Sequence, residues 1–154
     1  MGRLVWWRPI RNEPVDRARR KLIKEHGWMV MVVMGEPYFA YTIGIWHTFD
    51  APEFFIVGLS QESLHTVCNS YGEAVREGWR PKPCERVADW LEGEEVELHS
   101  IADGWKEHYL GIAADDYGTT AFPAVQGIWS SEGAFPNEDA WPERLVGTQF
   151  MLFE

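Results

Sequence analysis

Apolar and polar positions alternate along the chain in short blocks that predict a small set of strands and helices. The segment 28–34 is wholly apolar, and the segment 38–46 resumes this character after a turn at residues 35–37. Apolar runs of this length bounded by glycine and proline are typical of strands, so we expect the two segments to form a hairpin. A loop over 47–52 then leads into a third expected strand over 53–59.

Apolar residues at helical spacing predict three helices. Asn12 and Pro14 are suited to a helix start, and the apolar residues that follow predict a helix over 14–25 before Gly27. The clearest helix lies between the cap residue Ser60 and Gly78. Its apolar stripe consists of Leu64, Val67, Cys68, Tyr71 and Val75. A third helix is expected over 105–117.

The remaining segments complete the predicted fold. The prolines of 79–84 indicate a connector, because proline donates no hydrogen bond to a strand ladder. Further strands are expected over 95–99, over 123–129 and in the tail over 145–153. This order of elements predicts an α+β domain with a mixed or antiparallel sheet of about five to six strands and two to three helices.

The predicted strand 38–46 has two unequal faces. Side chains alternate between the faces of a strand, which separates Tyr41 and its bulky neighbours from the small residues Ala40, Thr42 and Gly44. A bare face of this kind indicates close approach of a helix, of another backbone or of a ligand. Helix packing and a ligand pocket both remain open at this stage.

Charge divides the chain of 154 residues unevenly. The whole chain has a formal net charge of −10, whereas residues 1–25 hold eight basic side chains against three acidic ones. We therefore expect a basic N-terminal arm with a helix over 1–25 and a main domain over 26–154. Docking of the arm onto its own domain is favoured over nucleic-acid binding, because the acidic body repels a polyanion.

Composition narrows the class of protein. A chain of this length buries a sizeable core without disulfides, so we expect Cys68 and Cys84 to be free thiols. The apolar runs are too short to cross a bilayer, and we expect a cytoplasmic protein with no membrane partner. No motif for nucleotide binding, nucleophilic hydrolysis or zinc ligation occurs, and we expect no metal site.

Several short segments resemble one family. They are Phe39-Ala40-Tyr41-Thr42-Ile43-Gly44, Pro52-Glu53, Val57-Gly58-Leu59, His26-Gly27-Trp28, Val75-Arg76-Glu77-Gly78, Tyr109-Leu110, Gln126 and Trp129. Together they resemble the bacterial DUF4262 family, a domain of unknown function, over roughly residues 26–137. The resemblance implies a domain of this type over 26–154 but supplies no reaction. The chain departs from the family pattern at Ser130-Ser131, where relatives commonly have Pro-Asp, and at Asn137, where they have Trp.

Candidate chemistry gathers around the predicted loop after the bare-faced strand. His47, Asp50 and Glu53 supply an imidazole and two carboxylates, and we expect these groups at the opening of any pocket beside the bare face. An imidazole next to a carboxylate can transfer protons near neutral pH. We therefore name these three as candidate catalytic residues. The candidate ligand-binding residues are Tyr41, Thr42, Gly44, Trp46, Gln126 and Trp129.

Two function classes remain open. The first is binding or transformation of a small planar ligand in a pocket beside strand 38–46, and an analogy of element order with split-barrel flavin reductases suggests flavin as the cofactor. The second is an acidic regulatory or immunity-type module that holds a basic protein partner, which charge reversal at Glu94, Glu95 and Glu97 would test. A homo-oligomer is compatible with either class.

Overall fold

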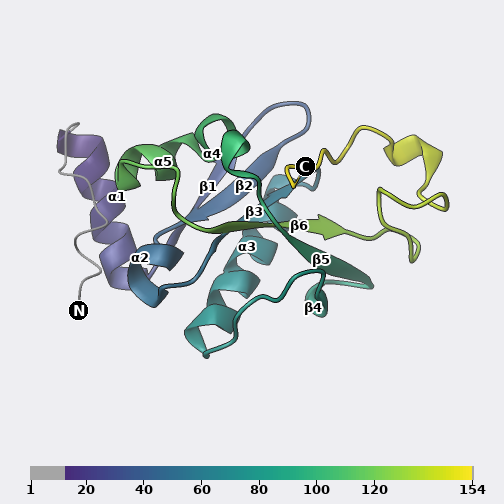
Figure 1. Ribbon diagram of the computed structural model, residues 1–154, viewed down its shortest axis with the longest axis horizontal. Coiled ribbons are helices and arrows are strands. Elements are labelled where there is room, and N and C mark those ends of the chain that lie inside the picture. Colours follow the sequence, from purple (N-terminus) through teal and green to yellow (C-terminus); the bar gives the residue numbers. More distant parts are fainter. Residues whose placement is uncertain (1–12, 154) are drawn as a thin grey trace.

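The computed structural model describes residues 13–153, which form three layers with a sheet in the middle (Figure 1). The elements of its N-terminal half are α1 (Glu13–His26), β1 (Met29–Val33), β2 (Phe39–Ile43), α2 (Ile45–Phe49), β3 (Glu53–Val57) and α3 (Gln61–Arg76). Those of its C-terminal half are β4 (Arg86–Leu91), β5 (Glu94–Ser100), α4 (Asp103–Tyr109), α5 (Gly111–Tyr117), β6 (Ala124–Trp129) and a short 3-10 helix (Glu143–Leu145).

The sheet is mixed and open. Its strand order is β1-β2-β3-β6-β5-β4, and β3 and β6 are the parallel pair among otherwise antiparallel neighbours. This confirms the expected α+β class and the hairpin of β1 and β2. The edge strands β1 and β4 do not pair with each other, so the sheet does not close into the barrel of the flavin-reductase comparison.

Helices cover both faces of the sheet, which explains the continuous apolar run of β3. Phe54 and Ile56 point into the core under α3, whereas Phe55 and Val57 point into the core under α4 and α5. Because a strand side chain alternates between faces, a strand buried on both sides needs apolar residues at every such position. The stripe predicted for α3 is buried in full, including Cys68, and both cysteines are free thiols as expected.

Helix α1 docks onto the far side of the sheet from α3 through a buried ion cluster. Arg19 donates from Nε and from Nη2 to the two oxygens of Asp116 in α5, each at 2.6 Å, and also to Asp16 at 2.8 Å. Ile23 completes the contact as part of the core under α5. This part of the basic arm therefore packs against its own domain, whereas residues 1–12 of the arm lie outside the described residues.

Three predicted elements were wrong in extent. The strand expected over 38–46 ends at Ile43, and α2 takes the place of the expected loop. The helix expected over 105–117 is two helices, because Leu110 between them has φ −116° and ψ 43°, outside helical values, and a glycine follows it. The tail expected as a strand over 145–153 forms no ladder, because the described structure holds it through glutamine side chains instead.

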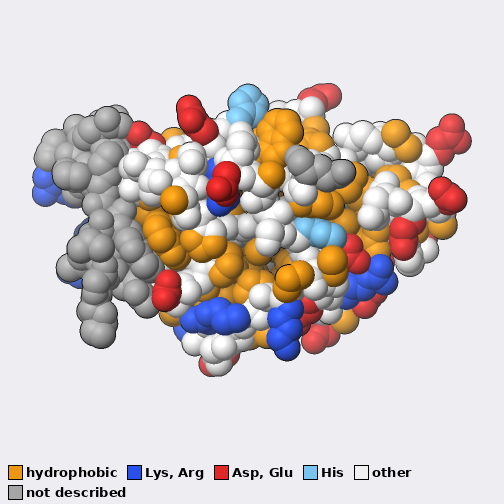
Figure 2. All heavy atoms as spheres, viewed as in Figure 1, with side chains coloured by type: hydrophobic (Ala, Val, Ile, Leu, Met, Phe, Trp, Pro, Cys, Tyr) orange, Lys and Arg blue, Asp and Glu red, His pale blue; other side chains and the backbone are white. Residues whose placement is uncertain are grey.

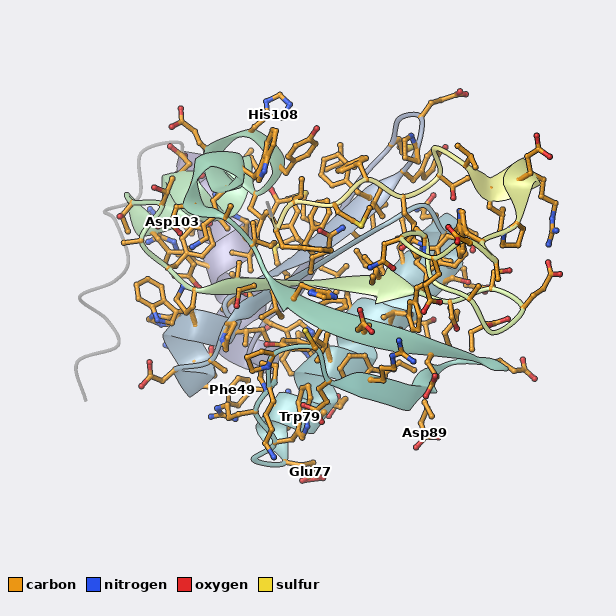
Figure 3. All side chains as sticks on the ribbon, turned by 45° about the vertical axis from the view of Figure 1, so that its right-hand side comes forward. Phe49, Glu77, Trp79, Asp89, Asp103 and His108 are labelled. Atoms are coloured by element: carbon orange, nitrogen blue, oxygen red, sulfur yellow. The ribbon has the colours of Figure 1, made fainter. Side chains whose placement is uncertain are left out.

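Strand β4 was missed by the sequence analysis. It follows the proline-rich connector and lies at the edge of the sheet, so five of its six residues remain at least partly exposed and it lacks an apolar stripe. Asp89 points away from the molecule on this edge (Figure 3). A charged, irregular edge strand is a common protection against pairing with another chain.

Candidate functional site

Glu53 lies at the centre of the candidate site as a fully buried carboxylate at the start of β3. Its donors are the Thr42 hydroxyl at 2.7 Å, the Tyr117 hydroxyl at 2.5 Å, and the backbone N–H groups of Gly44 at 3.0 Å, Ile45 at 3.2 Å and Trp46 at 3.1 Å. A carboxylate has roughly four lone-pair positions, so these donors occupy all of its hydrogen-bond acceptor sites. The network ties β2, β3, α2 and α5 together.

The local sequence explains why the carboxylate serves α2. Gly44 precedes this helix with φ +111°, and no side chain at that position caps it. A Cβ on Gly44 would lie 2.6 Å from Ile23 Cγ2, so the close approach of α1 requires glycine there. Glu53 supplies the missing cap from the next strand, where a negative charge complements the exposed N–H groups of a helix start.

Burial dominates the electrostatics of this network. Burial raises the pKa of Glu53 above its ordinary value, and the hydrogen bonds from Tyr117, Thr42 and the backbone offset only part of that effect. The pKa of Tyr117 is raised well above its ordinary value, first by burial and then by the neighbouring Glu53. Tyr117 therefore keeps its hydroxyl proton at neutral pH and donates it to Glu53, and the network positions α2.

The bare face of β2 is filled by the protein itself. Ala40 packs in the core with α3 residues such as Leu64 and Cys68, and the Thr42 hydroxyl is occupied by Glu53 and by the backbone N–H of Phe54. The helix alternative of the sequence analysis is therefore the one observed. An isoalloxazine ring has no place on this face, and the flavin comparison loses its geometric basis.

The other two candidate catalytic residues lie on and after α2. His47 is half-buried, and its backbone N–H donates to the Tyr117 hydroxyl at 3.3 Å. Asp50 is exposed and ends α2 with φ 58°. The structure thus links His47 to Glu53 through Tyr117, whereas Asp50 lies at the outer end of the helix. A catalytic role for His47, Asp50 and Glu53 stays a prediction.

Of the candidate ligand-binding residues, Thr42, Gly44 and Trp46 gather around Glu53, and the Trp46 ring packs edge-on against Tyr117 with centroids 4.9 Å apart. The other three do not join them. Tyr41 is on the opposite face of β2, where burial raises its pKa to about 12 and its hydroxyl accepts from the Ile112 N–H.

Gln126 and Trp129 serve the C-terminal segment. The Gln126 side chain donates to the Phe150 carbonyl at 2.7 Å and accepts from the Leu152 N–H at 2.7 Å. In the tail, the Gln149 side chain accepts from the Trp129 N–H and donates to the Trp129 carbonyl. The Trp129 indole N–H donates to the Val57 carbonyl at 2.8 Å. These bonds replace the strand pairing that the sequence analysis expected for the tail.

A groove of about 430 Å³ opens next to the Glu53 network, between α1, the edge strand β1 and α3. Gly44 connects the Glu53 network to the groove. A Cβ on Gly44 would lie 3.1 Å from the Gly27 carbonyl oxygen and 3.2 Å from Trp28 Cα, and Trp28 lines the groove. The lining residues are Leu22, His26, Trp28, Met29, Val30, His65, Asn69, Glu73 and Arg76.

Sequence reasoning missed the polar side of this groove. His65, Asn69, Glu73 and Arg76 follow one another in α3 at spacings of four, four and three residues, which places them on one helix flank beside the buried stripe. This periodicity among polar residues was the signal that could have found them.

The acidic residues named for a protein partner are partly engaged inside the domain. Glu94 accepts from the Ser130 hydroxyl at 2.7 Å and from the Glu132 N–H, so Ser130 joins the start of β5 to the end of β6 at a point where the chain departs from the family pattern. Glu97 bonds Arg86 and His99. Charge reversal at these positions would disturb the fold, and the partner hypothesis stays a prediction.

Residues 13–153 contain no group of three His, Cys, Asp or Glu side chains that could hold a metal ion. No helix in the same residues has the length and apolar character to span a membrane. On the face in Figure 2, acidic side chains are scattered around the rim and hydrophobic atoms are exposed in the middle.

The fold and site define a class of α+β domain in which an open mixed sheet, a buried glutamate at the start of β3 and a groove along α3 occur together. The chain belongs to the DUF4262 family, described as a domain of unknown function, whose family model matches residues 22–142. No curated protein and no solved structure matches the chain. The matched region includes α3, the Glu53 network and every residue that lines the groove.

Proposed function

We propose that this protein binds a small planar ligand in the groove between α1, β1 and α3. The observation that carries the proposal is the composition of the groove: an apolar floor formed by Trp28 and Val30 beneath a polar rim contributed by α1 and α3. Small-molecule sites in proteins combine such an apolar lining with a few polar groups that orient the ligand. A volume of about 430 Å³ accommodates a molecule of one or two rings.

The polar rim is held in place before any ligand arrives. The Trp28 indole N–H donates to the Asn69 side chain at 3.0 Å, and the Asn69 amide donates to His65 Nδ1 at 3.1 Å. The Arg76 guanidinium lies over the Trp28 ring, 4.6 Å from its centroid. A site organised in advance loses less conformational entropy on binding, which supports a binding role.

Packing fixes the floor as well. Trp28 lies against α3 so closely that a Cβ on Gly72 would be 2.4 Å from the indole ring. Because only 6% of Trp28 is exposed, a ligand meets the edge of the indole rather than stacking on its face. The Glu53 network supports this arrangement from behind, since it holds the turn at Gly44 that packs on Trp28.

Benzoate and benzamide, two planar probes of nearly equal shape, test the proposal by NMR titration of the histidine ring resonances. We expect saturable shifts at His26 and His65, which line the groove, for at least one probe. His99 in β5 and His108 in α4 serve as internal controls outside the groove and should not shift.

A variant links the shifts to the groove. Asn69→Leu removes the side chain that bonds both Trp28 and His65, and it should weaken probe binding about fivefold or more, as expected for a lost hydrogen bond. Circular dichroism checks that the variant is folded. Shifts of equal size at all four histidines, or no saturable shift with either probe, would show that the groove is not a binding site.

A further inference from the structure

We infer that the ligand carries a carboxylate, and that this carboxylate takes the place of Glu73 on the Arg76 guanidinium. The inference rests on the proposed function of the groove and specifies the chemistry of its ligand. Arg76 is the residue that determines this chemistry, because it is the arginine of the groove lining and its position is fixed from two sides.

The guanidinium is oriented by contacts that leave one side for a ligand. Its plane is held over the Trp28 ring, and Nη2 donates to the backbone carbonyl of His26 at the end of α1. Nη1 faces Glu73 instead. A planar guanidinium presents paired N–H groups that match the two oxygens of a carboxylate, so a fixed arginine of this kind is suited to a carboxylate ligand.

Glu73 is a weakly held partner of this guanidinium. Nη1 of Arg76 lies 3.2 Å from one Glu73 oxygen and 3.3 Å from the other, longer than the roughly 2.7–2.9 Å of strong charge-assisted bonds. The Glu73 side chain is 60% exposed, and ion pairs this exposed contribute little net free energy. Glu73 can therefore rotate into water and release the guanidinium to a competing carboxylate.

The rest of the groove fits the body of such a ligand. From Arg76, the α3 flank continues through Asn69 and His65, whose side chains can hydrogen-bond to polar atoms on the ligand ring. Val30 of β1, which packs against the core under α3, offers apolar contact opposite them. The class is therefore an aromatic or otherwise planar carboxylic acid, small enough for a groove of about 430 Å³.

Benzoate and benzamide separate charge from shape in the test. At one ionic strength, we expect the wild-type protein to bind benzoate more tightly than benzamide. Glu73→Gln should increase benzoate affinity about threefold, because it removes both the competing carboxylate and its repulsion, and should change benzamide affinity less than that. Glu77→Gln, the same change just beyond α3 and outside the groove lining, is the matched control and should alter neither.

Arg76→Lys keeps the charge but loses the paired N–H groups, and it should remove the preference for benzoate. Equal affinity for the two probes in the wild type, or an unchanged benzoate affinity in Glu73→Gln, would overturn the carboxylate inference while saturable shifts at His26 and His65 still supported the groove. Absence of those shifts with both probes would overturn the proposed function and this inference together.

Discussion

The Tyr117 hydroxyl donates a 2.5 Å hydrogen bond to the Glu53 carboxylate and so joins α5 to the first residue of β3, 64 positions earlier in the chain. The same hydroxyl accepts from the backbone N–H of His47, which brings α2 into the contact. A buried carboxylate is stable only when donors surround it. Glu53 meets this condition through groups from three other elements, so the network reports whether the parts of the site are assembled.

Removal of either partner should cost much of the protein's stability. Glu53→Gln turns an amide N–H₂ toward backbone donors and leaves buried groups without acceptors, and we expect a loss of about 3 kcal/mol or more in the free energy of unfolding. Tyr117→Phe should lose about 1.5 to 3 kcal/mol, the usual value for a hydrogen bond to a charged group. Urea denaturation measures both losses.

Tyr109→Phe is the control for the tyrosine change. Tyr109 is half-buried on the neighbouring helix α4, and its hydroxyl makes no hydrogen bond within residues 13–153. We expect the free energy of unfolding of Tyr109→Phe to stay within about 0.5 kcal/mol of the wild-type value. Equal losses for the two tyrosine variants would mean that the bond to Glu53 contributes nothing specific.

Close packing of Trp28 on α3 should make Gly72 intolerant of a methyl group. Gly72→Ala would place a Cβ 2.4 Å from the indole, so the ring must move, and we expect a loss of about 1 to 3 kcal/mol together with weaker probe binding in the groove. Gly104→Ala in α4 is the matched helical control, because nothing lies within 4 Å of its Cβ position.

Gly104→Ala should be neutral or stabilising by up to about 1 kcal/mol, because alanine reduces the entropy of the unfolded chain. Thermal unfolding of the two variants side by side gives the comparison. If Gly72→Ala were as stable as Gly104→Ala, the indole would not be held where the groove requires it.

The buried ion cluster predicts strong coupling between α1 and α5. Arg19 and Asp116 are 8% and 0% exposed, so removal of one partner leaves a buried charge without its bonds. We expect Arg19→Met and Asp116→Asn each to lose about 3 to 5 kcal/mol, and the double variant to lose clearly less than the sum. A double-mutant cycle in urea measures this coupling.

Hydrogen exchange gives an independent view of the same contact. Because Arg19 and Ile23 attach α1 to the core, the α1 amides should exchange faster in either single variant than in the wild type. Losses that simply add in the cycle, with unchanged exchange in α1, would contradict the coupling.

The sequence predicted the main elements because their periodicity is strong. The apolar stripe of α3 and the apolar runs of β1 to β3 follow patterns that burial imposes. What it missed depends on tertiary contacts. Helix α2 starts at a residue with a left-handed backbone and is capped by a carboxylate eight or nine positions away, and the tail is held by the side chain of Gln126 rather than by a ladder.

The sequence predicted only part of the candidate site, because the rest depends on tertiary contacts. The Tyr-Thr-Ile-Gly and Pro-Glu segments drew attention to Thr42, Gly44 and Glu53, which do meet in space. Alternation alone could not distinguish a face that admits a ligand from one that admits α3. The groove requires α1, β1 and α3 to converge, and a sequence pattern does not state which helix flank meets which strand edge.

Glu97 should make the stability of the β4–β5 pair depend on pH. Burial opposes ionisation of this carboxyl, yet the hydrogen bonds from Arg86 at 2.8 Å and from His99 at 2.7 Å outweigh it and lower the pKa of Glu97 below its ordinary value. A carboxyl with a lowered pKa in the folded state contributes stability at pH values above its unfolded pKa of about 4.5, and this contribution disappears as pH falls through the folded pKa.

Glu97→Gln removes this titration, so the variant should have a lower free energy of unfolding than the wild type at pH 7. The gap between the two free energies should shrink below about pH 4.5. Urea denaturation at several pH values between about 7 and 3 measures the gap, and a gap that stayed constant or widened toward acid would contradict the assignment of the lowered pKa to Glu97.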